Sequence, residues 1–247
     1  MKFSFLLFFV GLVCVSCGAP GLKPLKLPPP GADPNIFKTY DKKGDSVLAG
    51  GWSAGFDASG ISFNDPRTVT LITPRHVVMA KHYQRAKETP VIFHDRKGKR
   101  IERFIIDRQN LSSDLTVGLL DRPVPENYTP YPIPDSSTPV KDLIGNPAFV
   151  TDQDRRVFIH LIASVSANGL GFKQDAEKRY GWGKNLIVGD SGNPSFVASK
   201  GRLVLIETHT FGGPGSGPNF ADATLQKELN LAVKTLDPTY RVVTTKL

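Results

Sequence analysis

Short apolar runs separated by turn-forming residues constrain the fold of this chain more than any other feature of its sequence. Each run is only a few residues long, and Gly, Pro or Asp-Pro interrupts the pattern between runs. Such spacing is typical of antiparallel strands that close into a barrel or sandwich. The abundance of glycine (23) and proline (20) among 247 residues agrees with many short strands and turns. In the first half, the expected strands lie in residues 47–52, 60–63, 68–72, 76–80, 90–94, 103–107 and 115–120.

A proline-rich connection at 121–140 separates these strands from a second group. The chain is long enough for two modules that each bury a core. We therefore predict an all-β fold of two antiparallel β-barrels, at 37–125 and 141–247, joined by a strap at 126–140. The expected strands of the second barrel are 146–151, 155–165, 185–188, 193–199 and 202–210.

The C-terminal region departs from this pattern and predicts one helix. Asp222 is a suitable N-cap, and Pro238 ends the periodicity. We expect the helix to pack on the second module through one apolar face, formed by Leu225, Leu229, Ala232, Val233 and Leu236.

The N-terminus has the pattern of a signal peptide over residues 1–17. Lys2 precedes an apolar run at 3–15 that is short for a membrane span, although an uncleaved signal anchor remains an alternative. The residues before Cys17 resemble a bacterial lipobox, which implies lipidation of Cys17. Cleavage near Ala19 without lipidation is the alternative. Residues 18–36 read as a proline-rich, extended linker.

Both cysteines, Cys14 and Cys17, lie in this leader, so the exported domain contains no disulfide. A cysteine-free exported domain favours the bacterial cell envelope, with a membrane contact only through the N-terminal lipid. The formal net charge is +8, but the basic residues are scattered. The charged run at 95–103 alternates in sign and has no interleaved aromatics, so we expect a polar hairpin tip there and no nucleic-acid partner.

The stretch "GDSGNP" at 189–194 is the most specific chemical signal. A serine between glycines can sit on a tight turn where backbone N–H groups converge on an oxyanion, although a plain hairpin turn has the same composition. A serine nucleophile needs a base and an orienting carboxylate. Candidates for both occur upstream, in the order His, Asp, Ser.

These residues resemble the trypsin-like, chymotrypsin-fold serine peptidases, in which "GDSGGP" surrounds the nucleophile and "LTAAHC" contains the base. The resemblance covers about 47–233 but depends on three short motifs. It implies Ser191 as nucleophile, the N–H groups of Gly189 and Ser191 as the oxyanion hole, and polypeptide as substrate. Asn193 replaces a glycine of the family motif.

Two histidines compete for the role of base. "LITPRH" aligned with the family motif selects His76, whereas "VVMAKH" selects His82. Pro74 belongs in a turn between two strands, which favours a strand at 76–80 and His82 at its end. We therefore expect His82 to be the base and keep His76 as the alternative.

The carboxylate expected to orient the base is Asp114, at the start of the run "LTVGLL". There it can accept a hydrogen bond from the imidazole Nδ1–H. Asp107, in "FIIDRQ", is the weaker alternative.

The resemblance also implies a specificity pocket, for which the sequence is less informative. Its floor falls at Asn185, and a wall includes Thr208, His209, Thr210 and Gly212. A neutral floor does not support selection of Arg or Lys. His209 could favour an acidic side chain, because glutamate-specific relatives carry a histidine on this strand, but a structural histidine is the ordinary alternative.

The other motifs give weaker indications of function. "VLAGG" at 47–51 resembles the family's activation terminus, but neither Arg nor Lys precedes Val47, so we do not expect zymogen activation there. His94 and His160 lack metal-ligand spacing and are expected to be structural. We expect neither a metal nor a cofactor. The sequence thus predicts a serine endopeptidase, with an inactive binding or scaffold protein of the same fold, or an esterase, as alternatives.

Overall fold

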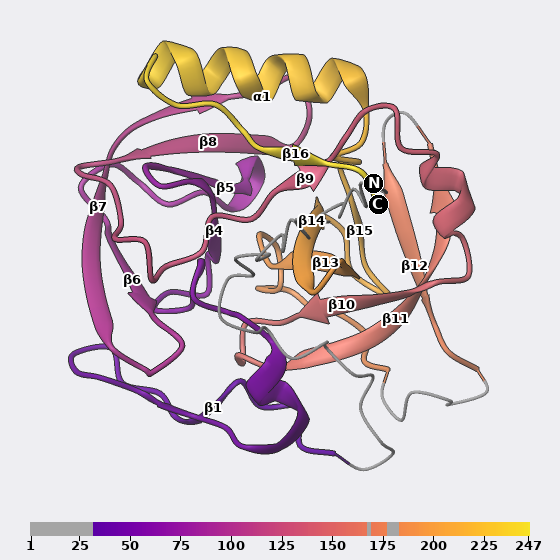
Figure 1. The fold of residues 1–247 in the computed structure, drawn as a ribbon, viewed down its shortest axis with the longest axis horizontal. Coiled ribbons are helices and arrows are strands. Elements are labelled where there is room, and N and C mark those ends of the chain that lie inside the picture. The colour runs from indigo at the N-terminus through magenta and orange to yellow at the C-terminus, as the bar shows by residue number, and fades with distance from the viewer. Residues whose placement is uncertain (1–31, 167–168, 177–182) are drawn as a thin grey trace, which may run out of the picture.

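The chain folds into two curled antiparallel β-sheets with a helix across one of them, in a computed structural model that describes residues 32–166, 169–176 and 183–247 (Figure 1). The predicted signal peptide at 1–17, with Cys17, lies outside the described residues, as does most of the linker at 18–36. Within the described ranges, no helix is long and apolar enough to cross a membrane.

The first sheet has the strand order β3-β4-β5-β8-β7-β6. The Ile92 N–H of β6 donates to Ser62 Oγ of β3, so the two edge strands approach each other and the sheet curls. The strands are β3 (Ile61–Ser62), β4 (Val69–Thr73), β5 (His76–Ala80), β6 (Pro90–His94), β7 (Arg100–Asn110) and β8 (Leu115–Leu120).

The second sheet has the order β14-β13-β10-β11-β12-β15 and curls in the same manner. Thr210, just after β14, donates its N–H to Ser216 of β15 across the opening. Two curled antiparallel sheets confirm the all-β prediction and are compatible with a chymotrypsin-like double barrel. The strands are β10 (Pro147–Thr151), β11 (Val157–Val165), β12 (Leu170–Gln174), β13 (Pro194–Ser199), β14 (Arg202–Thr208) and β15 (Ser216–Gly217).

Two short strand pairs lie outside these sheets. Near the N-terminus, β1 (Phe37–Thr39) pairs with β2 (Val47–Leu48), followed by a 3₁₀ segment at Gly51–Gly55. Within the strap, β9 (Ile133–Pro134) pairs in parallel with the C-terminal β16 (Thr244–Thr245).

The strap at 126–140 contacts both sheets and is followed by a 3₁₀ turn at Val140–Leu143. Its Tyr131 N–H donates to Leu71 of β4, and its Pro132 carbonyl accepts from Leu205 of β14. The end of the expected linker is also packed: Ile36 is buried, and its N–H donates to Arg155. These contacts fix the two sheets relative to each other.

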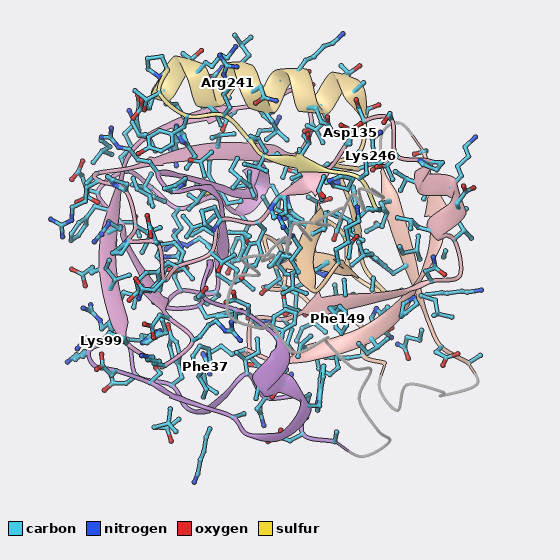
Figure 2. The ribbon with its side chains drawn as sticks, in the orientation of Figure 1. Phe37, Lys99, Asp135, Phe149, Arg241 and Lys246 are labelled. Atoms are coloured by element: carbon cyan, nitrogen blue, oxygen red, sulfur yellow. The ribbon has the colours of Figure 1, made fainter. Side chains whose placement is uncertain are left out.

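Apolar side chains form three layers, one inside each sheet and one between the sheets. Val77 and Met79 of β5 point into the first interior, whereas Val78 points into the middle layer. Strand alternation therefore buries both faces of β5. Phe149 of β10 points into the interior in Figure 2 and packs in the middle layer, while Lys99 lies on the outside. Each fully buried apolar side chain contributes about 1.5–3 kcal/mol.

The predicted C-terminal helix is present as α1 (Ala223–Leu236), but the expected packing partner was wrong. Asp222 caps it by accepting from the N–H groups of Thr224 and Leu225. The helix lies across β7 and β8 of the first sheet rather than on the second module (Figure 1). Leu225 and Leu229 join the middle layer beside Leu115. Amphipathic spacing identified the buried face but carried no information on the surface that covers it.

Candidate active site

His82, Asp114 and Ser191 form one continuous hydrogen-bonded chain between the two sheets. The His82 Nδ1 lies 2.6 Å from Asp114 Oδ2, and the His82 Nε2 lies 2.9 Å from Ser191 Oγ. Asp114 Oδ1 also accepts the backbone N–H of His82 at 3.0 Å. Of the two candidate histidines, His82 is the one that meets Ser191.

The carboxylate determines which ring nitrogen carries the proton. An ionised Asp114 can only accept, so Nδ1 of His82 donates and Nε2 is left as an acceptor for the Ser191 hydroxyl. The His82 and Asp114 side chains are 46% and 31% exposed, so the histidine can be reached from solvent. The arrangement can move a proton from a serine hydroxyl to an imidazole that a carboxylate stabilises.

His82 is held in place by the backbone that follows β5. The strand ends at Ala80, and a 3₁₀ turn at Lys81–Tyr83 projects the histidine out of the sheet. Arg85, three residues later, is fully buried and donates to the carbonyl oxygens of Arg67 at 2.6 Å and Ser62 at 3.1 Å. The guanidinium thus ties this loop to the neighbouring strands in a domain where no cystine is available.

Ser191 sits on a turn that depends on the two glycines around it. Gly189 and Gly192 have φ values of +98° and +92°, in the left-handed region that disfavours side chains. A Cβ on Gly192 would lie 2.7 Å from the Thr68 carbonyl oxygen of the first sheet. The second glycine therefore lets the Ser191 segment approach the sheet that carries His82.

The amide of Gly189 is oriented by a residue that sequence reasoning missed. Gln153, in the turn between β10 and β11, donates its side-chain N–H to the Val188 carbonyl oxygen at 3.0 Å. The C=O and N–H of a trans peptide point in opposite directions, so the Gly189 N–H faces away from Gln153. Neither this N–H nor that of Ser191 has an acceptor in the described part of the chain. Both donors are therefore available for an anion.

The two alternatives weighed against these residues lie elsewhere. His76 begins β5, is fully buried, and its Nδ1 lies 2.7 Å from Thr73 Oγ1. Burial lowers the pKa of His76 to about 4. Asp107 is on β7, where it pairs with Lys87 at 2.5 Å. In the described part of the chain, neither residue forms a hydrogen bond or ion pair with His82 or Ser191.

The candidate pocket residues are only partly gathered around Ser191. Asn185 is exposed, and its side chain accepts from Gln174 of β12. The adjacent Leu186 is buried, and its N–H donates to the Gly213 carbonyl at 2.6 Å. A Cβ on Gly212 would lie 3.2 Å from the Leu186 carbonyl oxygen. The segment that follows the expected floor residue Asn185 therefore lies in direct contact with the end of the expected wall at Gly212 and Gly213.

His209, one of the expected wall residues, belongs to a second, buried hydrogen-bonded chain. His209 is 1% exposed; its Nδ1 lies 2.9 Å from Glu207 Oε1, and its Nε2 lies 3.3 Å from Ser195 Oγ. Thr208 is buried, and Thr210 is nearly so. This chain repeats the connectivity of the exposed one, but burial separates it from solvent. The predicted preference of His209 for an acidic substrate side chain stays a prediction.

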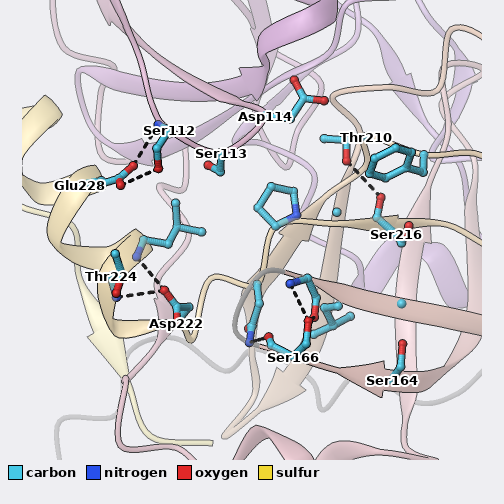
Figure 3. A pocket seen from close by; sticks show the side chains of 18 residues that line it. Ser112, Ser113, Asp114, Ser164, Ser166, Thr210, Ser216, Asp222, Thr224 and Glu228 are labelled. Carbon is cyan, nitrogen blue, oxygen red and sulfur yellow. Dashed lines mark hydrogen bonds between the residues drawn. The ribbon is translucent and has the colours of Figure 1, made fainter.

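A cavity of about 680 Å³ with a mixed polar and apolar lining opens beside Asp114, between the first sheet, the start of α1 and the β11–β12 connection (Figure 3). Its lining includes serine hydroxyls from both sheets and no Lys, Arg or His. Glu228 accepts from Ser112, and Asp222 caps α1. The lining can exchange hydrogen bonds with an extended backbone.

The remaining histidines have internal partners. His94 lies 3.2 Å from the Gly44 carbonyl oxygen through Nε2. His160 Nδ1 lies 2.7 Å from the Pro214 carbonyl oxygen, its Nε2 accepts from the Lys184 N–H, and burial lowers its pKa to about 4. In the part of the chain that the structure describes, no group of three or more His, Cys, Asp or Glu side chains could hold a metal ion.

Gln153 and Arg85 contact the segments that carry the site residues but have no local sequence signal. Each contacts a segment remote in the sequence, so only the tertiary structure brings it there. An arginine soon after a candidate base, in a chain without cystines, is the nearest approach to a signal.

No protein-family model matches the chain, and no curated protein matches it. The functional proposal therefore depends on the geometry described above.

Proposed function

We propose that this protein is a serine endopeptidase that hydrolyses polypeptides through His82, Asp114 and Ser191. The observation that carries the proposal is the chain of hydrogen bonds from Asp114 through His82 to Ser191, at 2.6 and 2.9 Å. Serine, imidazole and carboxylate in this connectivity activate a hydroxyl that is otherwise a poor nucleophile.

In the first half of the reaction, Ser191 Oγ attacks the substrate carbonyl carbon and His82 Nε2 takes the hydroxyl proton. The N–H groups of Gly189 and Ser191 donate to the oxyanion. The C–N bond then breaks, and His82 gives its proton to the leaving amine. Asp114 stays ionised and stabilises the imidazolium.

In the second half, water attacks the acyl group on Ser191 while His82 takes a proton from the water. The intermediate collapses, the C–Oγ bond breaks, and the proton returns to Ser191 Oγ. The products are two shorter peptides and the original side chains, so no cofactor is required. We further propose that the domain acts in the bacterial cell envelope, attached through a lipid on Cys17.

The proposal is tested by labelling the natively folded protein with a fluorophosphonate probe. We expect Ser191 to be labelled, and His82→Ala to abolish labelling because no base remains at the hydroxyl. His76→Gln should retain most labelling, because His76 contacts Thr73 rather than Ser191. Ser195→Ala is the matched serine control and should also be labelled at Ser191.

Absence of labelling, together with no cleavage of a denatured protein substrate, would favour an inactive binding protein of this fold. Ester turnover without amide turnover would favour an esterase. Matched peptides with Glu, Ala, Leu or Lys before the scissile bond would then define specificity. Equal or lower rates for Glu would refute the role of His209 in selecting an acidic side chain.

A further inference from the structure

Two buried carboxylates lie directly behind the nucleophile, and one lysine reaches both. Asp190 precedes Ser191 and is 1% exposed, while Asp152, at the end of β10, is fully buried. The Lys184 Nζ lies 2.6 Å from Asp152 Oδ2 and 3.8 Å from Asp190 Oδ2. Its side chain is 21% exposed, so the ammonium is largely withdrawn from water.

The Asp190 carboxylate holds the segment that forms the candidate oxyanion hole. One oxygen accepts the N–H of Ile187 at 2.8 Å, and the other accepts the N–H of Gln153 at 3.0 Å. The first bond folds 187–190 into a turn. The second ties that turn to the residue that orients the Gly189 amide.

A buried carboxylate is costly when only neutral donors meet it. Asp152 has a second cation, because Arg156 contacts it at 2.7 Å. Among the described residues, Lys184 is the one cationic group within 4 Å of Asp190. Loss of the ammonium would therefore leave Asp190, rather than Asp152, without a close counterion.

We propose that Lys184 is a positioning residue whose ammonium holds Asp190, and through it residues 187–191, in the conformation that presents the Gly189 and Ser191 N–H groups. The inference rests on the proposed peptidase function and assigns to Lys184 the role of counterion for Asp190. Since the cation is a side chain of the intact chain, the site needs no new N-terminus. Val47 begins the motif that resembles the family's activation terminus. It lies in β2, where it pairs with Thr39, and is 54% exposed.

The test compares Lys184→Met, Lys184→Arg and wild type in the full chain, by the rate constant of fluorophosphonate labelling of Ser191 and by peptide hydrolysis. We expect Lys184→Met to lower the labelling rate and kcat by about 10- to 100-fold, because an uncompensated Asp190 charge destabilises the productive turn. Lys184→Arg should restore most of the rate. Lys173→Met, which removes an exposed lysine of β12, is the matched charge control and should behave as wild type.

A second comparison separates the two carboxylates. Asp152→Asn should lower the rate much less than Lys184→Met if Lys184 acts through Asp190. The intact mass of labelled wild type should show an uncut chain around Val47.

Several results would overturn the inference: wild-type rates for Lys184→Met, equal losses in Lys184→Met and Asp152→Asn, a loss that Lys184→Arg does not reverse, or labelling confined to chains whose N-terminus is at or near Val47. Unlabelled wild type would instead contradict the proposed function. The two failures are therefore distinguishable.

Discussion

Gln153→Met removes one hydrogen bond and tests whether the contact of Gln153 with the Val188 carbonyl oxygen orients the Gly189 amide. The Gln153 side-chain N–H donates to the Val188 carbonyl oxygen at 3.0 Å, and methionine keeps the length of the side chain but not the donor. The net free energy of such a bond is about 0.5–1.5 kcal/mol. Since 1.4 kcal/mol corresponds to a factor of ten, the population with the Gly189 N–H facing the substrate should fall by about 2- to 10-fold.

The expected result is a fall in kcat/KM of the same size, with the melting temperature nearly unchanged because Gln153 is only partly buried. Complete loss of one oxyanion donor costs about 10²- to 10³-fold, which is the ceiling for this substitution. Hydrolysis of a chromogenic peptide and the rate of fluorophosphonate labelling measure the effect. Gln109→Met on β7 serves as control. An unchanged kcat/KM for Gln153→Met would refute the reasoning and leave the Asp190 contact with Ile187 as the element that sets the peptide orientation.

Three further predictions concern stability. Burial lowers the pKa values of His76 and His160 to about 4, so between pH 6.5 and 4 only the unfolded state gains these protons. As the pH falls over that window, the free energy of unfolding should therefore decrease by on the order of 3 kcal/mol per histidine. Equal urea midpoints at pH 7 and 4.5 would contradict this expectation. Asp222→Ala should lower the free energy of unfolding by about 1 kcal/mol in thermal unfolding, because the N–H groups at the start of α1 lose their acceptor. Asp222→Asn should retain most of the wild-type stability, because the asparagine side chain can also accept from these N–H groups. Arg85→Met should destabilise the fold by about 3 kcal/mol or more, because several buried carbonyl groups lose their donor; a urea midpoint within error of wild type would show that water replaces the guanidinium.

Local features of the fold followed from local sequence. The strand His76–Ala80 and the turn at Pro74 have the predicted bounds, because proline disfavours the ladder and the apolar run after it has strand length. The cap and end of α1 also agree with the prediction. Both signals act over a few residues, so a single sequence contains them in full.

Elements with weak or misleading local patterns were missed. Residues 185–188 were predicted as a strand because three of the four are apolar, but they form only an isolated bridge at Leu186, because they are the loop that precedes the nucleophile. The strand Leu170–Gln174 was not predicted, since its exposed end is polar and a glycine lies within it. The pairing of β9 with β16 joins two dipeptides from distant parts of the chain.

The sequence by itself determined the class of fold, the positions of most strands, the helix cap and a short set of candidate residues, because periodicity, turn residues and motif composition are local properties. It left two histidines competing for one role. Only the tertiary structure shows which of them lies against Ser191, because the distance from a ring nitrogen to Ser191 depends on how two sheets pack. The same packing placed α1 on the first sheet and brought Gln153 and Lys184 behind the nucleophile, through contacts that no local pattern encodes.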